Sequence, residues 1–217
     1  MADLRQFCTR FSPLTEEAMD QLLQISTTKT YRKGRYLLKQ GQTCKHLFFI
    51  NSGLVKSFFI SGDKEFVMRF FTDNLLFSVF DSFITQTPSK FNLVALEETT
   101  VTLINHDALE DLCNKHHCIE TLFRKLVSVA AVKMTKRISE MLERDAAERY
   151  NQFVLENGDA IQRISLGDIA KYLGITQPSL SRIRANHFLP YGKKPQAAPH
   201  LPLSKKQGKN GNNKLGN

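Results

Sequence analysis

The 217-residue sequence lacks the features of a membrane or secreted protein. It has no uninterrupted apolar run long enough to span a bilayer, and its first residues, MADLRQFCTR, do not form the apolar stretch of a secretory signal. We therefore expect a cytoplasmic protein with no membrane association. Its four cysteines are then expected to stay reduced. The hydrophobic content of 41% is enough for one substantial core or two modest ones.

Common catalytic motifs are also missing, because the chain has no Walker loop, nucleophile elbow or zinc-protease helix. The nearest approach to a metal or iron–sulfur site is the pair Cys113 and Cys118, which brackets His116 and His117. Their spacing is not the two-residue knuckle of structural zinc, and the other two cysteines are far away in sequence. We expect these residues to pack at helix ends, and we expect neither an enzyme nor a cofactor. An enzyme or metalloprotein built around them is the alternative.

Acidic residues are absent from the last part of the chain. All 21 lie at or before Asp168, whereas nine lysines and arginines follow, from Lys171 to Lys214. The formal net charge of +9 is therefore concentrated in the C-terminal segment. Positive charge segregated in this way favours attraction to nucleic-acid phosphates.

The segment 164–184 of that region, ISLGDIAKYLGITQPSLSRIR, has the pattern of two short helices joined by a tight turn. Ser165 can cap the first helix, and Gly174 can end it because glycine tolerates the left-handed conformation. Thr176 can cap the second helix, whose first turn accepts Pro178 at little cost. The apolar residues expected to turn inward are Ile169, Ala170, Leu173, Leu180 and Ile183.

Polar and basic residues occupy the outward or flanking positions of the second helix. They are Gln177, Pro178, Ser179, Ser181, Arg182 and Arg184. Glutamine and arginine can pair bidentately with adenine and guanine edges. The pattern therefore predicts a helix-turn-helix that binds DNA, and the alternative is an ordinary helical hairpin with solvated arginines.

The first half of the chain changes from a helical to a strand-like pattern. Residues 4–25 are expected to form short helices, and residues 31–105 form short apolar segments separated by glycines and polar turns, typical of a β barrel or roll. Ser61-Gly62-Asp63 is expected to form a hairpin turn. The expected strands cover residues 36–38, 47–50, 54–60, 65–71, 91–96 and 101–105.

An apolar stripe then predicts a long helix that continues to about Arg144 without glycine or proline. A helix of this length is hard to cover within a small domain, so we expect part of its stripe to contact a second copy of the chain. The residues assigned to this dimer face are Leu122, Leu126, Val129, Met134, Ile138 and Met141. The alternative is that the helix packs wholly on its own β domain. Asp145 is expected to cap a following helix that ends near Leu155.

This order of elements resembles the Crp/Fnr family of bacterial transcription regulators over about residues 5–186. The resemblance rests on KGRYLLKQGQTCKHLFFINSGLVKSFF at 33–59 and YLGITQPSLSRIR at 172–184. The segments SLSRIR, AAERY at 146–150 and PSKFNLVALE at 88–97 are similar to the branch common in Bacteroidetes-like bacteria.

The resemblance implies an α+β fold with an N-terminal cyclic-nucleotide-binding-like β roll, a long central dimerisation helix and a C-terminal winged helix-turn-helix. The expected boundaries are 1–115 for the effector domain, 116–144 for the dimerisation helix, 145–188 for the DNA-binding domain and 189–217 for a basic, disordered tail.

Roles on the second helix of the motif also follow from the resemblance. Gln177, Pro178 and Arg182 match base-reading positions; Thr176, Ser179 and Ser181 would lie beside phosphates, with Arg184 as a further backbone contact. The implied function is sequence-specific transcription regulation by a homodimer on an inverted repeat, with half-sites about 34 Å apart. The expected partners are double-stranded DNA and a second copy of the chain, with RNA polymerase as a further candidate.

The effector pocket departs from the family pattern. Members that bind cyclic nucleotides hold the ribose with a Gly-Glu pair and the cyclic phosphate with an Arg-Ser pair, whereas the corresponding positions here are Ser78-Val79 and Ser89-Lys90. Lys90 offers a point charge without the fork of arginine, so we do not expect cyclic AMP to bind. The effector is not identified. The pocket either holds a different small molecule or is filled by its own side chains, and the phenylalanines that would make it apolar are Phe77, Phe80, Phe83 and Phe91.

The second departure follows Arg184, where the family continues its recognition helix with charged residues. Prolines at 190, 195, 199 and 202 oppose a long helix here. Either the tail lysines strengthen non-specific DNA contact, or the tail has no role and a shortened helix binds weakly. The rival function is therefore a ligand or redox sensor with impaired DNA binding that acts through protein contacts.

Overall fold

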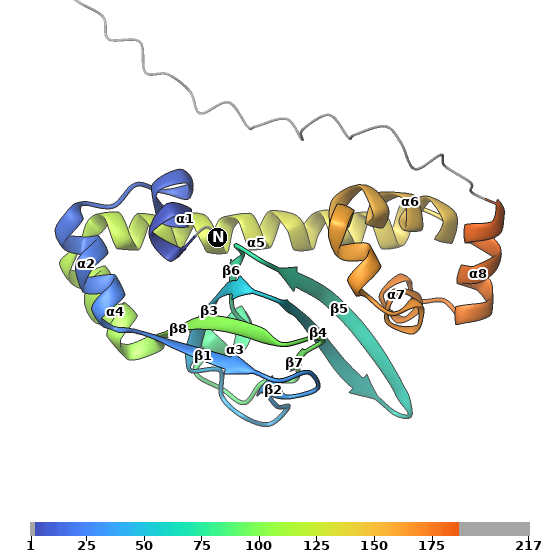
Figure 1. The fold of residues 1–217 in the computed structure, drawn as a ribbon, viewed down its shortest axis with the longest axis horizontal. Helices are drawn as coiled ribbons and strands as arrows, with labels where there is room; N and C mark the ends of the chain where they lie inside the picture. Colours follow the sequence, from blue (N-terminus) through green and yellow to red (C-terminus); the bar gives the residue numbers. More distant parts are fainter. Residues whose placement is uncertain (1–2, 187–217) are drawn as a thin grey trace, which may run out of the picture. The chain divides into compact units, whose positions relative to one another are not determined.

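The computed structural model describes residues 3–186, which form an N-terminal pair of helices, two β-sheets, a long helix and a C-terminal group of helices (Figure 1). The predictions on residues 187–217, including the tail and any wing, lie outside the described residues. Within the described part, no helix combines the length and the apolar character needed to cross a membrane.

Two short helices open the chain, as the sequence predicts. The first, α1 (Leu4–Phe11), begins at Asp3, whose carboxylate accepts a hydrogen bond from the Gln6 amide. The second, α2 (Glu16–Gln24), begins at Thr15, whose hydroxyl accepts from the Ala18 amide. Both caps satisfy backbone groups that a helix start leaves unpaired.

Two antiparallel four-stranded sheets form the β roll. The order in the first sheet is β1 (Ser26–Tyr31), β8 (Thr99–Asn105), β3 (His46–Ser52) and β6 (Leu76–Phe77). The order in the second is β2 (Tyr36–Leu38), β7 (Asn92–Ala95), β4 (Leu54–Ser61) and β5 (Lys64–Thr72). A short helix, α3 (Phe80–Thr85), connects β6 to β7.

The six strands expected from the sequence are confirmed, and β1 and β6 are additional. The sequence of β1, STTKTY, is polar because β1 lies at the edge of its sheet and most of its residues are exposed. The strand β6 has only two residues, too few for an alternating pattern. The expected hairpin turn is also confirmed, since Ser61 pairs with Lys64 across Gly62-Asp63.

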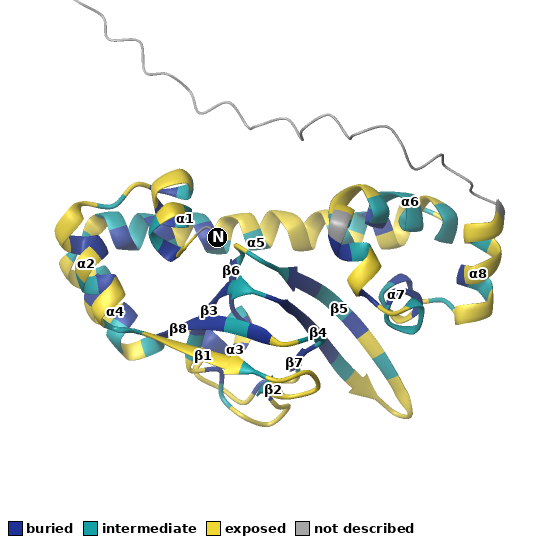
Figure 2. Ribbon diagram, viewed as in Figure 1, coloured by how far each residue is buried: buried dark blue, intermediate teal, exposed yellow. Residues whose placement is uncertain are grey.

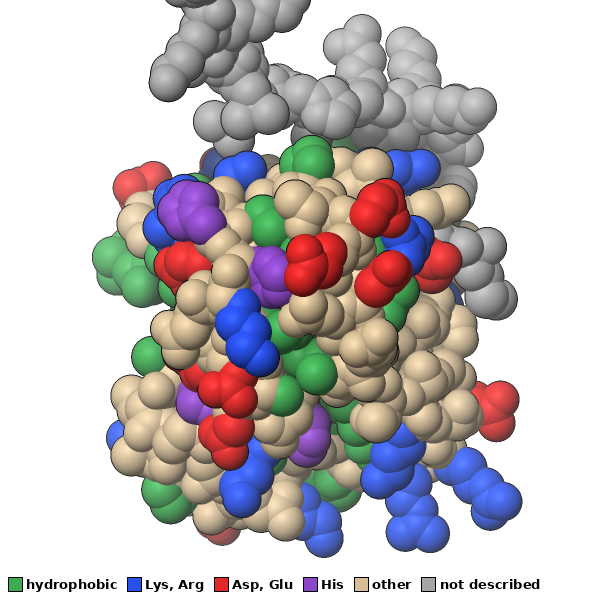
Figure 3. Space-filling view, turned by 90° about the vertical axis from the view of Figure 1, so that its left-hand side faces the viewer, with side chains coloured by type: hydrophobic (Ala, Val, Ile, Leu, Met, Phe, Trp, Pro, Cys, Tyr) green, Lys and Arg blue, Asp and Glu red, His purple; other side chains and the backbone are tan. Residues whose placement is uncertain are grey.

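The core of the roll is built from apolar residues of both sheets and of the helices that pack on them. Leu22 of α2 and Leu109 of α4 (His106–Lys115) contribute to it, and both are almost completely buried. On the face formed by α2 and α4, acidic and basic side chains are intermixed, so this face has no extended patch of one sign (Figure 3).

The long helix α5 (His117–Glu143) is confirmed, and its burial changes along its length (Figure 2). Leu122 and Leu126 are buried in the core of the β roll. Further along, Val129, Met134, Ile138 and Met141 have exposed fractions of 40, 44, 57 and 44%. This corrects the assignment of Leu122 and Leu126 to the dimer face, because their own chain already covers them.

Four helical segments follow α5. They are α6 (Ala146–Asn157), η1 (Gly158–Arg163), α7 (Leu166–Leu173) and α8 (Gln177–Asn186). Asp145 begins α6 as predicted, and it forms a capping box in which its carboxylate accepts from the Glu148 amide while Glu148 accepts from the Asp145 amide. The predicted α+β order of β roll, long helix and helix-turn-helix is therefore confirmed.

One glycine in the β roll has no room for a side chain. Gly53, between β3 and β4, has φ +118°, and a Cβ there would lie 2.6 Å from the Cα of Thr99. Thr99 is completely buried and cannot move away. Both the conformation and the space therefore require glycine at this position.

We predict that Gly53→Ala lowers the free energy of unfolding by roughly 2–4 kcal/mol, because it adds backbone strain to a steric overlap. Urea denaturation followed by circular dichroism measures this change. Gly62→Ala is the matched control, since Gly62 has φ +60° but open space around it, and it should cost only about 1 kcal/mol. Equal losses in the two variants would show that the contact with Thr99 contributes nothing.

Candidate nucleic-acid interface

Local sequence signals define both helices of the motif. The Ser165 hydroxyl accepts from the Asp168 amide and begins α7. Gly174 ends α7 with φ +70°, the left-handed conformation that the sequence predicts. The Thr176 hydroxyl accepts from the Ser179 amide at 3.3 Å and so caps α8.

The outer face of α8 carries the residues predicted to contact DNA. Thr176, Gln177, Pro178, Ser181, Arg182 and Arg184 are exposed, and Ser179 is half-buried. The Ser179 hydroxyl lies 2.9 Å from the hydroxyl of Thr176, so these two residues support each other at the start of the helix. Among the described residues, neither Arg182 nor Arg184 has an acidic partner. Both guanidinium groups are therefore available to a ligand.

The inner faces of α7 and α8 pack on each other, and α7 also packs on the β roll. Their buried residues share one apolar cluster with the sheet that contains β4 and β5. The members from the sheet are Leu54, Phe58, Val67, Phe70 and Val94, and those from the helical segment are Phe153, Ile164, Ile169, Ala170, Leu173 and Leu180. We call this contact the seam. It was not predicted from the sequence.

Aromatic rings form the centre of the seam. The ring of Phe70 on β5 lies 5.9 Å from that of Phe153 on α6 and 5.7 Å from that of Tyr172 on α7. The rings of Phe153 and Tyr172 are 4.8 Å apart. Tilted and edge-on aromatic contacts of this kind stabilise a fixed arrangement of the elements that carry them.

A buried lysine connects the two sides of the seam. The Nζ of Lys56 on β4 lies 2.7 Å from a carboxylate oxygen of Asp168 on α7 and 2.8 Å from one of Glu65 on β5. Burial alone would lower the pKa of Lys56, but hydrogen bonds to Asp168 and Glu65 outweigh it and raise that pKa above its ordinary value. Lys171 of α7 also approaches Glu65, at 3.4 Å.

Two arginines bind the C-terminal end of α7. The guanidinium of Arg137 on α5 lies 3.7 Å from the centre of the Tyr172 ring and donates to the Tyr172 carbonyl. Arg149 of α6 donates to the Leu173 carbonyl at 3.2 Å. Cations are favourable at this end of a helix because the last carbonyls are unpaired there. The motif is thus held by α5 and α6 in addition to the sheet.

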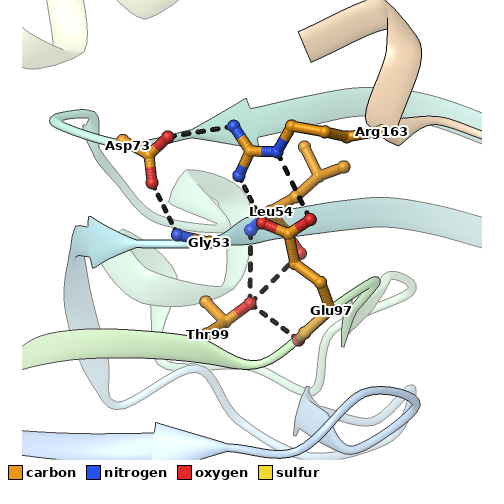
Figure 4. A network of polar contacts seen from close by, with 6 residues as sticks. All are labelled: Gly53, Leu54, Asp73, Glu97, Thr99 and Arg163. Carbon is orange, nitrogen blue, oxygen red and sulfur yellow. Dashed lines mark hydrogen bonds and ion pairs between the residues drawn. The ribbon is translucent and has the colours of Figure 1, made fainter.

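A third set of polar contacts joins Arg163 to two carboxylates of the β roll (Figure 4). Its guanidinium donates to Asp73 at 3.0 Å and binds both carboxylate oxygens of Glu97. Arg163 is the last residue of η1, two residues before Ser165, the cap of α7. This contact and the Lys56 pair therefore both join the start of α7 to the β roll.

The residues predicted to line an effector pocket lie around α3. Phe77, Ser78, Val79 and Ser89 are buried, Phe91 is half-buried and Lys90 is exposed. The two serine hydroxyls already have partners, because Ser78 donates to the His46 carbonyl at 2.9 Å and Ser89 donates to the Phe91 carbonyl at 3.0 Å. The Phe77 ring stacks on that of Phe71 with 3.8 Å between ring centres.

Cys113, His116, His117 and Cys118 lie at the junction of α4 and α5. His116 contacts Gln21 of α2 at 3.1 Å, and burial raises the pKa of Cys113 to about 12. In residues 3–186 no three His, Cys, Asp or Glu side chains are arranged to hold a metal ion.

Comparison with known proteins gives a family match and several relatives. The "Cyclic nucleotide-binding domain" family matches residues 28–116. The chain is 30% identical over 194 residues to the "Anaerobic regulatory protein" of Haemophilus influenzae, covering 83% of this chain and 74% of that protein. It is 29% identical over 194 residues to the "Fumarate and nitrate reduction regulatory protein" of Vibrio cholerae, covering 83% and 76%. Both relatives are named as regulatory proteins and not as enzymes.

Solved structures share the fold at lower identity. FixK2 from Bradyrhizobium japonicum has a TM-score of 0.63 and 20% identity, covering 75% of this chain and 84% of its own. A putative transcriptional regulator of the Crp/Fnr family from Eubacterium rectale has a TM-score of 0.65 and 14% identity, covering 80% and 83%.

We predict that Lys56→Met lowers the free energy of unfolding by roughly 3 kcal/mol, because in a partly buried site it leaves Asp168 without an ion pair and Glu65 with only the longer contact to Lys171. Urea denaturation measures the effect. Lys64→Met is the control, since Lys64 is exposed and has no ion pair among the described residues, and it should change stability little. A control as unstable as Lys56→Met would contradict the role given to the buried pair.

Proposed function

Because the chain belongs to the Crp/Fnr family of transcription regulators, we propose that it is a sequence-specific DNA-binding regulator that acts as a homodimer on an inverted-repeat site. The observation that carries this proposal is the outer face of α8, where Gln177 and Arg182 are exposed and Arg182 has no acidic partner in the described part of the chain. Arginine pairs bidentately with guanine and glutamine with adenine, so this face can read bases.

Within this proposal, three groups of residues have distinct roles. Gln177, Pro178 and Arg182 read base edges. Thr176, Ser179, Ser181 and Arg184 contact the DNA backbone. The dimer face is assigned to the exposed apolar residues of α5, Val129, Met134, Ile138 and Met141, because exposed large apolar residues favour contact with a matching surface. Met134, Ile138 and Met141 share one side of the helix. RNA polymerase is a further partner in this proposal.

The β roll acts as the effector domain, and we propose that it does not bind cyclic AMP. The hydroxyls of Ser78 and Ser89 donate within the chain, and Lys90 lacks a guanidinium fork. The proposal includes no cofactor and a cytoplasmic location, and it leaves the effector unidentified. We also propose that the chain belongs to the Bacteroidetes-like branch, which the segments SLSRIR, AAERY and PSKFNLVALE support. The proposed domain boundaries are 1–115, 116–144 and 145–188.

A second candidate function is a ligand or redox sensor with impaired DNA binding. The observation that favours it is the limited number of free cations, because Arg163 and Lys171 are paired with acids of the β roll. Binding of promoter fragments distinguishes the two candidates, because the second candidate has impaired DNA binding.

We expect Arg182→Ala to weaken binding to preferred promoter fragments by roughly tenfold to a hundredfold and to reduce discrimination among fragments, because one base-reading guanidinium is lost. A gel-shift series against a panel of promoter fragments measures both effects. Arg184→Ala is the comparison variant, and it should weaken binding to all fragments evenly. Equal, salt-sensitive binding of wild type and Arg182→Ala to every fragment would contradict sequence-specific reading.

We expect Ile138→Glu to dissociate the homodimer, because Ile138 is 57% exposed in the single chain and a carboxylate in a dimer interface would lose its hydration. Sedimentation velocity over a concentration series measures the oligomeric state. Leu155→Glu, at a 62% exposed position on α6, is the matched control and should leave the dimer intact. A monomeric wild type, or a dimer that tolerates Ile138→Glu, would refute the assigned interface.

A further inference from the structure

The β roll holds Arg163 in a receptor made by three separate turns. Asp73 follows β5, Glu97 lies between β7 and β8, and Gly53 joins β3 to β4. The guanidinium of Arg163 binds both oxygens of Glu97 and one oxygen of Asp73 (Figure 4). This is the forked geometry in which arginine binds carboxylate or phosphate groups.

The Asp73 carboxylate and the backbone of Glu97 are held in place by the roll itself. The second oxygen of Asp73 accepts from the Gly53 amide at 2.6 Å. The buried hydroxyl of Thr99 donates to the backbone carbonyl of Glu97 at 3.0 Å and accepts from the Leu54 amide at 3.2 Å. These bonds do not involve the helical segment, so they do not depend on Arg163.

The Arg163 contact is much more exposed than the Lys56 pair. The exposed side-chain fractions are 30% for Arg163, 39% for Asp73 and 36% for Glu97, against 9% for Lys56. Ion pairs in contact with solvent are weak and are screened by salt, whereas buried pairs are screened much less. The Arg163 contact can therefore open under conditions in which the Lys56 pair stays closed.

The position of Arg163 would allow its guanidinium to contact the DNA backbone. In a helix-turn-helix the first helix crosses the DNA backbone. Arg163 precedes the cap of that helix, Ser165, by two residues. A phosphate offers the same arrangement of acceptor oxygens as the carboxylate of Glu97. The β roll therefore binds a guanidinium that a DNA backbone would also attract.

We propose that Asp73 and Glu97 compete with DNA phosphates for Arg163, so that this contact stays closed until DNA displaces it, while the seam and the Lys56 pair keep the helix-turn-helix on the β roll. The proposal rests on the DNA-binding function proposed above and describes its regulation. Docking lowers the affinity for DNA because one phosphate-binding cation is occupied, and a change in the β roll that moves either carboxylate alters DNA affinity directly.

The test measures binding of a mixed-sequence DNA duplex to the full chain over a series of salt concentrations. Glu97→Gln weakens the receptor, and Glu98→Gln is the matched control, because it makes the same charge change at an exposed neighbour with no ion pair in the described part of the chain. We expect Glu97→Gln to bind roughly threefold to tenfold more tightly than Glu98→Gln at low salt. The slope of log K against log salt should be steeper for Glu97→Gln, because rising salt also weakens the internal ion pair against which DNA competes in Glu98→Gln.

Two further variants separate competition from a loss of structure. Asp73→Asn should also increase affinity, since its amide oxygen can still accept from Gly53 while its charge is lost. In Glu97→Gln/Arg163→Gln the gain should disappear and affinity should equal that of Arg163→Gln alone. If Glu97→Gln and Asp73→Asn bind no more tightly than Glu98→Gln while the wild type binds DNA, the competition is refuted. If the wild type binds no duplex at any salt concentration, the proposed function itself fails, and the competition fails with it.

Discussion

The seam between the β4–β5 face of the roll and the helix-turn-helix is the constraint on which the rest of the structure depends. The helix α7 has only eight residues, and helices of this length are marginal in water without tertiary packing. Leu54 and Phe70 of the sheet supply that packing. Lys56 also fixes the position of α7 along the sheet, because a buried ammonium must be paired with carboxylates. Asp168 can pair with Lys56 only when α7 occupies this position. The orientation of α8 is in turn set by α7.

The sequence was sufficient where the signal is local. Ser165, Gly174 and Asp145 define helix ends through their own side chain or their own backbone freedom, so each could be recognised without knowing the fold. The strand β1 could not be recognised from the sequence, since an edge strand in contact with water needs no alternation of apolar and polar residues. The outer face of α8 was predicted for the same reason as the caps, because its polar residues alternate with Leu180 at helical spacing.

The seam itself was missed because it depends on contacts between distant residues. The strand β4 is buried at five successive positions from Leu54 to Phe58, so both of its faces are covered. Two of these residues are Lys56 and Ser57, so the sequence does not show the continuous apolar run of a strand buried on both faces. The stripe on α5 posed the converse problem. Its apolar residues recur along the whole helix, but Leu126 is covered by the roll and Ile138 is not. The spacing of apolar residues cannot show whether the roll or a second chain covers them.

The structure also changes what the segregated charge means. Composition alone suggests that the cations in and beside the motif can attract DNA, yet Arg163 and Lys171 are paired with Glu97, Asp73 and Glu65 of the roll. Within the described residues, the motif retains Arg182 and Arg184 as unpaired cations. The number of lysines and arginines in this segment is therefore an upper limit on the number of phosphates that it neutralises, because each internal ion pair must break before its cation can replace a DNA counterion. The same acids that stabilise the docked motif thus set how strongly its DNA affinity depends on salt.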